Sequence, residues 1–150
     1  MSASNSRRSP ALRGAAALLD AAAEILESLE GAVVYRGVDD LSFEFAGVPG
    51  LVQVGDLTDR VQLVVITCVA VREAKPSDAF RRWIVDRSGG LLMGSLVLSS
   101  GSGDAADEAT ADLLVRYAFP AAGLDESAMR VLILPVVAAA VEIAGEAAAL

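Results

Sequence analysis

The chain has 150 residues, of which 54% are apolar, so it is long enough for one domain with a substantial core and too short for two. Twelve basic residues stand against twenty acidic ones, and the formal net charge of −8 opposes binding to nucleic acids and to anionic membrane surfaces. The sequence contains no histidine, which excludes Ser-His-Asp and Cys-His catalysis and histidine-containing zinc sites. We therefore expect a binding module rather than an enzyme.

Location and domain organisation follow from the single cysteine and from two short segments. Cys68 cannot form an internal disulfide, so the sequence does not require an oxidising compartment, and we expect a cytoplasmic protein. Residues 1–9 lack the apolar core of a signal peptide, and we expect them to form a disordered arm before a single domain over residues 10–150. The longest uncharged aliphatic run, Val131 to Val141, is about half of the roughly 20 residues that cross a bilayer, so no membrane span is expected.

The first predicted element is a long amphipathic helix. Ser9 and Pro10 are typical of an N-cap and a first helical position, and Gly31 is typical of a C-terminal stop. Between them, apolar residues recur with a spacing of three and four, which places them on one side of a helix. This apolar stripe consists of Leu12, Ala15, Leu19, Ala22, Leu26 and Leu29. We expect the stripe to be buried against a sheet or a partner.

After residue 32 the apolar pattern changes to a period of two, which predicts an antiparallel meander. Leu41 to Phe45 alternates clearly, and Leu51 to Val54 resumes an extended run after a turn signal at residues 47–50. The run Val61 to Val71 is apolar at both sets of alternating positions. This pattern predicts a strand that is covered on both sides, or covered on one side and joined to a partner on the other.

The next elements are a short helix and two strands. Pro76-Ser77-Asp78 predicts a helix start, and Ser88-Gly89-Gly90 predicts its end. Gly94 lies within the following strand, Leu91 to Ser99, where a glycine usually marks a bulge or a close backbone approach. Residues 99–110 have the composition of a flexible acidic loop, which leads into a strand over residues 111–119.

The last predicted element is a helix that is aliphatic almost all round. Asp125 is a suitable N-cap, and Gly123 precedes it in a turn. Pro135 lies in the helix interior, where proline typically costs about 3 kcal/mol and produces a kink. Burial of several aliphatic side chains would offset that cost, so we expect this helix to pack across the sheet.

The candidate chemical groups are few. Cys68 lies in an apolar strand without a basic neighbour and is expected to be an inert core thiol. Glu44, Asp56 and Asp59 lie near strand ends, so a carboxylate-dependent enzyme remains a third possibility. No spacing in the sequence is typical of a metal or cofactor site, and we expect none.

In this order of elements, helix, three or four strands, helix, two strands and helix, the chain resembles the YbjN-domain proteins and the type III secretion chaperones of the Tir-chaperone class. The resemblance extends from about Ala11 to Ala148 and implies an α+β fold with an antiparallel meander sheet. The residues that carry it are Leu41 to Phe45, Leu51 to Val54, Pro76, Arg81-Arg82-Trp83, Gly94, Leu114 to Pro120 and Gly123-Leu124-Asp125.

The resemblance implies a homodimeric, non-enzymatic, chaperone-like or adaptor protein that binds a protein or peptide client on apolar surfaces. The resemblance assigns no catalytic residue to this sequence. A regulatory domain that senses a small apolar ligand between helix and sheet is the alternative. For the partner-binding surface we propose apolar residues of the first helix and the sheet, together with the tryptophan, which is enriched in binding hot spots. These residues are Leu19, Leu26, Val54, Leu63, Val65 and Trp83.

Overall fold

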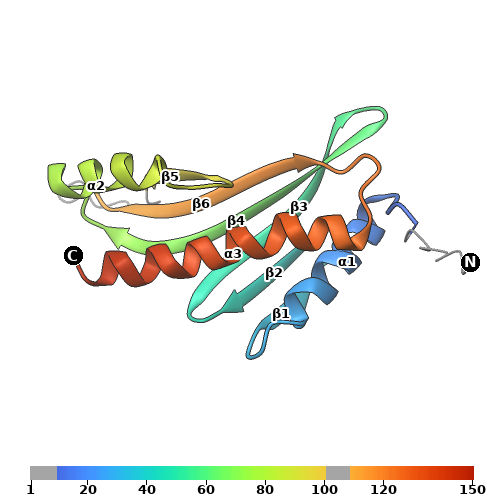
Figure 1. The fold of residues 1–150 in the computed structure, drawn as a ribbon, viewed down its shortest axis with the longest axis horizontal. Coiled ribbons are helices and arrows are strands. Elements are labelled where there is room, and N and C mark those ends of the chain that lie inside the picture. Colours follow the sequence, from blue (N-terminus) through green and yellow to red (C-terminus); the bar gives the residue numbers. More distant parts are fainter. Residues whose placement is uncertain (1–9, 101–108) are drawn as a thin grey trace, which may run out of the picture.

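The computed structural model describes residues 10–100 and 109–150, and it consists of three helices and one six-stranded sheet (Figure 1). The disordered arm expected at residues 1–9 and most of the acidic loop expected at residues 99–110 lie outside the described residues. In chain order the elements are α1 (Ala15–Glu27), β1 (Val33–Arg36), β2 (Asp40–Phe45), β3 (Val48–Thr58), β4 (Val61–Ala74), α2 (Asp78–Ser88), β5 (Ser95–Ser100), β6 (Ala111–Pro120) and α3 (Glu126–Ala148).

The sheet is open and entirely antiparallel, with the strand order β1-β2-β3-β4-β6-β5. The first four strands form the predicted meander, and β6 then pairs with β4 while β5 closes the other edge. The predicted α+β fold class and the order of its elements are therefore confirmed.

The core lies between one face of the sheet and helices α1 and α3, which cross that face (Figure 1). Strand residues alternate between buried and accessible positions, so that Val64, Ile66 and Cys68 of β4 are all 0% exposed. Helix α3 supplies six buried residues to the same core: Met129, Ile133, Val136, Val137, Ala140 and Ile143. Each large apolar side chain buried in this way contributes roughly 1.5–3 kcal/mol.

Helix α1 begins later than the sequence predicts. Its N-cap is Gly14, whose φ of 86° is incompatible with a helical residue, and the helix extends only from Ala15 to Glu27. Leu12, two residues before Gly14, donates its backbone N–H to the carbonyl of Leu124 at 2.8 Å. Leu12 is therefore tied to the β6–α3 connection instead of extending the helix.

The strand β5 also begins later than predicted, because Gly94 ends the turn before it. Gly94 has a φ of 87°, and a Cβ at this position would lie 3.1 Å from the carbonyl oxygen of Arg116. The glycine thus permits both a left-handed backbone and a close approach to β6. The expected close approach is confirmed, whereas the strand starts at Ser95 rather than Leu91.

Helix α2 is capped as predicted and is linked to the end of α3. The Ser77 hydroxyl accepts the N–H of Phe80 at 3.1 Å. The Arg87 guanidinium donates to Glu146 at 2.8 Å and to Glu142 at 3.0 Å, both on α3. The hydrogen bond to Glu146, followed by the charges of both carboxylates, raises the pKa of Arg87 against the opposing effect of burial. These ion pairs hold α2 beside the last turns of α3.

Helix α3 begins as predicted, with the Asp125 carboxylate accepting the N–H of Ala128 at 2.8 Å, and it contains Pro135 on its exposed side. By length and composition it is the one helix in the described part of the chain that would be able to span a membrane, with a mean hydropathy of 2.0. The uncharged run Val131 to Val141 alone is too short to cross a bilayer, whereas the whole helix Glu126–Ala148 is long enough. In the fold, 28% of the stretch is buried, and its buried side chains pack into the core against the sheet.

Candidate functional site

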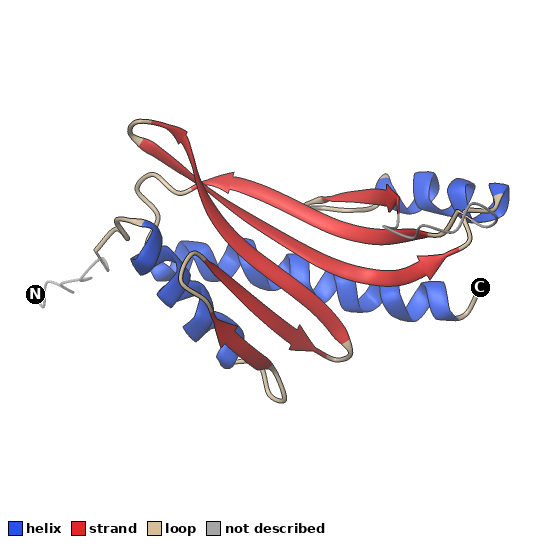
Figure 2. Cartoon of the chain, turned by 180° about the vertical axis from the view of Figure 1, so that it is seen from behind, coloured by secondary structure: helices blue, strands red, loops and turns tan. Residues whose placement is uncertain are grey.

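The candidate site is the sheet face opposite α1 and α3, which we call the open face (Figure 2). The buried residue of α2, Ile84, belongs to the same core as the other helices, so α2 does not cover this face either. The open face is formed by the strand residues that alternate with the buried ones. On it lie Val33, Tyr35, Asp40, Ser42, Glu44, Pro49, Leu51, Gln53, Leu63, Val65, Thr67, Val69, Ser95, Val97, Ser99, Asp112, Leu114, Arg116 and Ala118.

The middle of the open face is apolar. Leu51, Val65, Val69 and Leu114 are half-buried by their neighbours on the sheet, and none of them belongs to the core or packs against it. A groove of about 490 Å³ crosses this region, and its lining includes Leu51, Val69 and Leu114. The groove is therefore apolar at its centre and accessible from the solvent.

Polar and charged residues occupy fixed positions around the apolar centre. The strand register places Ser42, Leu51, Thr67 and Arg116 opposite one another in one row across β2, β3, β4 and β6. Arg116 is exposed and forms no ion pair with any residue that the structure describes. It is therefore available to a partner.

The structure separates the six predicted partner-binding residues into three groups. Leu63 and Val65 lie on the open face. Leu19 and Leu26 are 1% and 0% exposed, so the expectation that they contact a partner is corrected: the helix stripe is core.

The other two predicted residues lie away from the open face. Val54 faces the helices and packs against the core. Trp83 is half-buried on α2, where its ring stacks on Phe80 with 5.7 Å between centroids. Neither residue contributes to the open face.

Sequence reasoning missed the centre of the open face, namely Leu51, Val69, Leu114 and Arg116. The available signal was the alternation itself, since Leu51 and Leu114 are apolar at positions that point away from the buried residues of their own strands. This alternation does not indicate which face the helices cover. Only the packing of α1 and α3 resolves that question.

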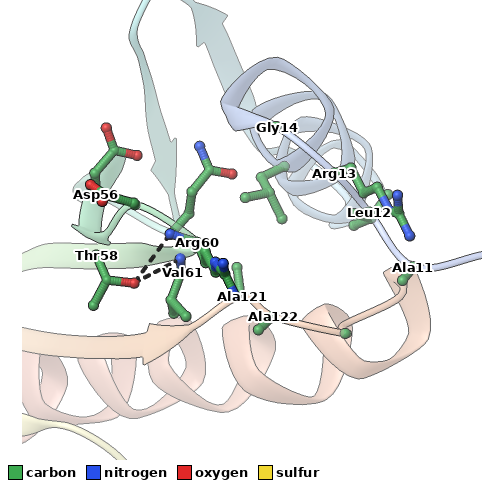
Figure 3. Close-up of a pocket in the computed structure, with 14 residues that line it drawn as sticks. Ala11, Leu12, Arg13, Gly14, Asp56, Thr58, Arg60, Val61, Ala121 and Ala122 are labelled. Atoms are coloured by element: carbon green, nitrogen blue, oxygen red, sulfur yellow. Dashed lines mark hydrogen bonds between the residues drawn. The ribbon is translucent and has the colours of Figure 1, made fainter.

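The carboxylates considered for catalysis do not converge. Asp56 and Asp59 line a second cavity, of about 450 Å³, between the start of α1, the β3–β4 turn and the β6–α3 connection, whereas Glu44 does not line it. Figure 3 shows the Asp56 side chain directed away from Arg13. The Thr58 hydroxyl shapes the turn by accepting the N–H groups of Arg60 and Val61 at 3.2 and 3.1 Å.

Other reactive groups are inaccessible or dispersed. Cys68 is 0% exposed on the core side of β4, and burial raises the pKa of its thiol to about 12. A thiol that stays protonated is a poor nucleophile and a poor metal ligand. Within residues 10–100 and 109–150, no three Cys, Asp or Glu side chains are grouped closely enough to hold a metal ion.

Comparison with known proteins supports the fold. No protein-family model matches the sequence, and a search of the curated proteins found no match. Among solved structures, the chain is similar to the crystal structure of YbjN, described as a candidate transcription regulator from E. coli. The match has a TM-score of 0.60 and 17% identity, and it covers 94% of this chain and 96% of that one. The chain therefore has a YbjN-like α+β fold.

Proposed function

We propose that this protein is a non-enzymatic module that binds another polypeptide through the open face of its sheet. The observation that carries the proposal is the uncovered apolar centre of that face, around Leu51, Val69 and Leu114. Single exposed apolar residues are ordinary on protein surfaces, whereas a contiguous apolar patch with a polar rim is typical of an interaction site.

The charge of the chain favours a protein partner over nucleic acid. A net charge of −8 repels phosphate backbones, and Arg116 is a single cation within a row of uncharged residues. The similar YbjN structure is described as that of a candidate transcription regulator. If this chain has a regulatory role, we propose that it acts through contact with a protein, in a chaperone-like or adaptor manner in the cytoplasm.

The proposal is tested by replacing two leucines at the centre of the open face with glutamine, a neutral polar residue. Leu51→Gln together with Leu114→Gln removes apolar area from the groove without changing net charge. In affinity capture from a lysate with the immobilised full chain, we expect a defined polypeptide to be recovered by the wild type and reduced at least about tenfold by the double variant.

The matched control is Val131→Gln together with Leu92→Gln, which alters residues that are 62% and 95% exposed outside the open face. The control should capture as much polypeptide as the wild type. Equal capture by the open-face variant and the wild type would contradict the proposed function.

A second candidate function, sensing of a small ligand, is favoured by the 450 Å³ cavity beside the start of α1 (Figure 3). Its lining includes Arg13, Arg60, Asp56 and Asp59, which suit a polar ligand better than the apolar ligand that the sequence suggested. Native mass spectrometry of the purified chain should then show a retained small molecule, and Ala122→Trp, which fills the cavity, should abolish it.

A further inference from the structure

We propose that the segment bound by the open face carries two opposite charges: an acidic side chain over β6 and a basic side chain over β2, with apolar side chains between them. The inference rests on the proposed function, because it gives the chemistry of the partner of the same surface. It is carried by the positions of Arg116, Asp40 and Glu44 relative to the groove.

The groove on the open face crosses the strands from β2 to β6. Ser42 of β2 lines one end, and Leu114 and Arg116 of β6 line the other. With β3 and β4 between them, β2 and β6 are three strand spacings apart, or about 14 Å. A segment that follows the groove therefore has its two ends over different strands.

The β6 end of the groove is basic. Arg116 is the one charged residue among the described residues that line the groove. Its side chain is exposed and forms no ion pair within residues 10–100 and 109–150. A segment that covered this end without an acidic group would take the guanidinium out of water and leave it unpaired, which is unfavourable. An aspartate or glutamate of the partner offsets that penalty.

The β2 end of the groove is acidic. Asp40 and Glu44 lie two residues before and two residues after Ser42, so each is about 7 Å from it along the strand and on the same face. Both are exposed, and neither forms an ion pair in the described part of the chain. A lysine or arginine that leaves the groove over β2 therefore meets two negative charges.

The third carboxylate of the open face, Asp112, does not line the groove. It precedes Arg116 by four residues on β6, which is about 13 Å along the strand. Its carboxylate accepts the backbone N–H of Glu73 at 2.8 Å, where the pairing of β4 with β6 is irregular. Asp112 therefore stabilises the sheet at that point, and the charge that a segment in the groove meets over β6 is that of Arg116.

The middle of the groove fixes the spacing of the partner's charges. Leu51, Thr67 and Val69 of β3 and β4 line it and carry no charge, so the apolar side chains of the segment lie there. An extended chain advances about 3.3 Å per residue and a helix about 1.5 Å. The acid and the base are therefore about four residues apart in an extended segment and about nine in a helix.

The experiment selects binders for the immobilised full chain from a phage-displayed library of random peptides about 16 residues long, enough for either spacing. Peptides that also bind the Leu51→Gln, Leu114→Gln variant are removed, so that those retained depend on the centre of the open face. We expect the retained peptides to be enriched in an acid and a base at one of the two spacings. A retained peptide is then synthesised, and its Kd is measured by calorimetry.

Charge-changed chains test which end of the peptide lies over which strand. Arg116→Glu should raise the Kd of the peptide at least about tenfold, because an acid then meets an acid. The Arg116→Glu, Glu44→Arg chain has an unchanged net charge. It should bind a peptide with its acid and base exchanged more tightly than the wild type does, and this gain also shows that the variant is folded.

Matched controls carry the same changes in charge on α2, away from the open face. Arg82→Glu matches the single variant, and Arg82→Glu together with Asp86→Arg matches the double variant, because both residues are exposed. Both controls should bind the selected peptide with the Kd of the wild type.

Three results would overturn the inference and retain the proposed function. They are retained peptides without enrichment of acidic residues, an Arg116→Glu chain that binds the selected peptide as tightly as the wild type, or an exchanged peptide that gains nothing on the double variant. Failure of the proposed function is distinct: no recovered peptide would then depend on Leu51 and Leu114, and the inference would fail with it.

Discussion

At the scale of single residues, burial in the core determines how the thiol of Cys68 ionises. Its ordinary pKa of 9.0 is raised to about 12 because burial disfavours the thiolate. In the unfolded chain the thiol ionises near pH 9, whereas in the folded chain it stays protonated up to about pH 12. Its contribution to the free energy of unfolding is therefore complete below about pH 9. The contribution is lost as the pH rises toward 12.

We therefore predict that the free energy of unfolding falls by about 1.4 kcal/mol for each pH unit above pH 9 on account of this group. Urea denaturation of the wild type and of Cys68→Ala at pH 8.5, 9.5 and 10.5 measures the effect as a difference. The alanine variant should be less stable at pH 8.5 and should lack this slope, so that the difference between the two proteins narrows as the pH rises. Parallel pH profiles for the two proteins would contradict the buried position of the thiol.

A second residue-scale prediction concerns Gly50, which lies opposite Phe43 in the β2–β3 register. A Cβ at Gly50 would overlap the ring of Phe43, which is 3% exposed and held in the core. Gly50→Ala should therefore lower the free energy of unfolding by about 1–3 kcal/mol.

The matched control for this prediction is Gly55→Ala on the same strand, where a Cβ would meet nothing within 4 Å. This variant should be as stable as the wild type or slightly more so, because alanine restricts the unfolded chain. Equal thermal midpoints for the two alanine variants would argue against the close packing of Phe43 on Gly50.

At the scale of elements, α2 depends on Arg87 for its position. Arg87 pairs with Glu142 and Glu146 of α3, and α2 itself contains a single buried residue, Ile84. Arg87→Gln should cost about 1 kcal/mol of stability, as expected for a partly exposed ion-pair network. Its larger effect should be local, because Ile84 is the single buried side chain of α2, and Phe80 and Trp83 are only partly buried against the core.

Hydrogen exchange measures this local effect. Amides of α2 should exchange several-fold faster in Arg87→Gln, whereas amides of α1 and α3 should be nearly unchanged. Arg82→Gln is the matched control, since Arg82 is exposed and its Nε contacts only the backbone carbonyl of Asp78, at 3.4 Å. Unchanged exchange in α2 after loss of Arg87 would show that the ion pairs do not hold it.

Local signals predicted most elements correctly. Ser77 and Asp125 cap α2 and α3 as their sequence positions indicate, and the apolar run from Val61 is one long strand. Errors occurred where tertiary contacts override local preference. Leu12 hydrogen-bonds to the β6–α3 connection, so α1 starts after Gly14 rather than at Pro10.

At the scale of the whole molecule, the candidate site was only partly predictable. The two-sided apolar pattern of β4 indicated a second apolar surface, and Leu63 and Val65 lie on the open face. Leu19 and Leu26 have the same apolar character, yet they are core because α1 lies against the sheet. Periodicity identifies a face, but only tertiary packing decides whether that face is covered.

The central claim, that a polypeptide covers the open face in solution, is tested most directly by carbene footprinting of the full chain. Labelling of Leu51 and Leu114 is measured first in the dilute chain. It should be several-fold lower in the concentrated chain or in the complex with a captured polypeptide. Labelling of Val131, which is 62% exposed on α3, should stay constant. Unchanged labelling of both leucines, with protection confined to the helices, would contradict the account.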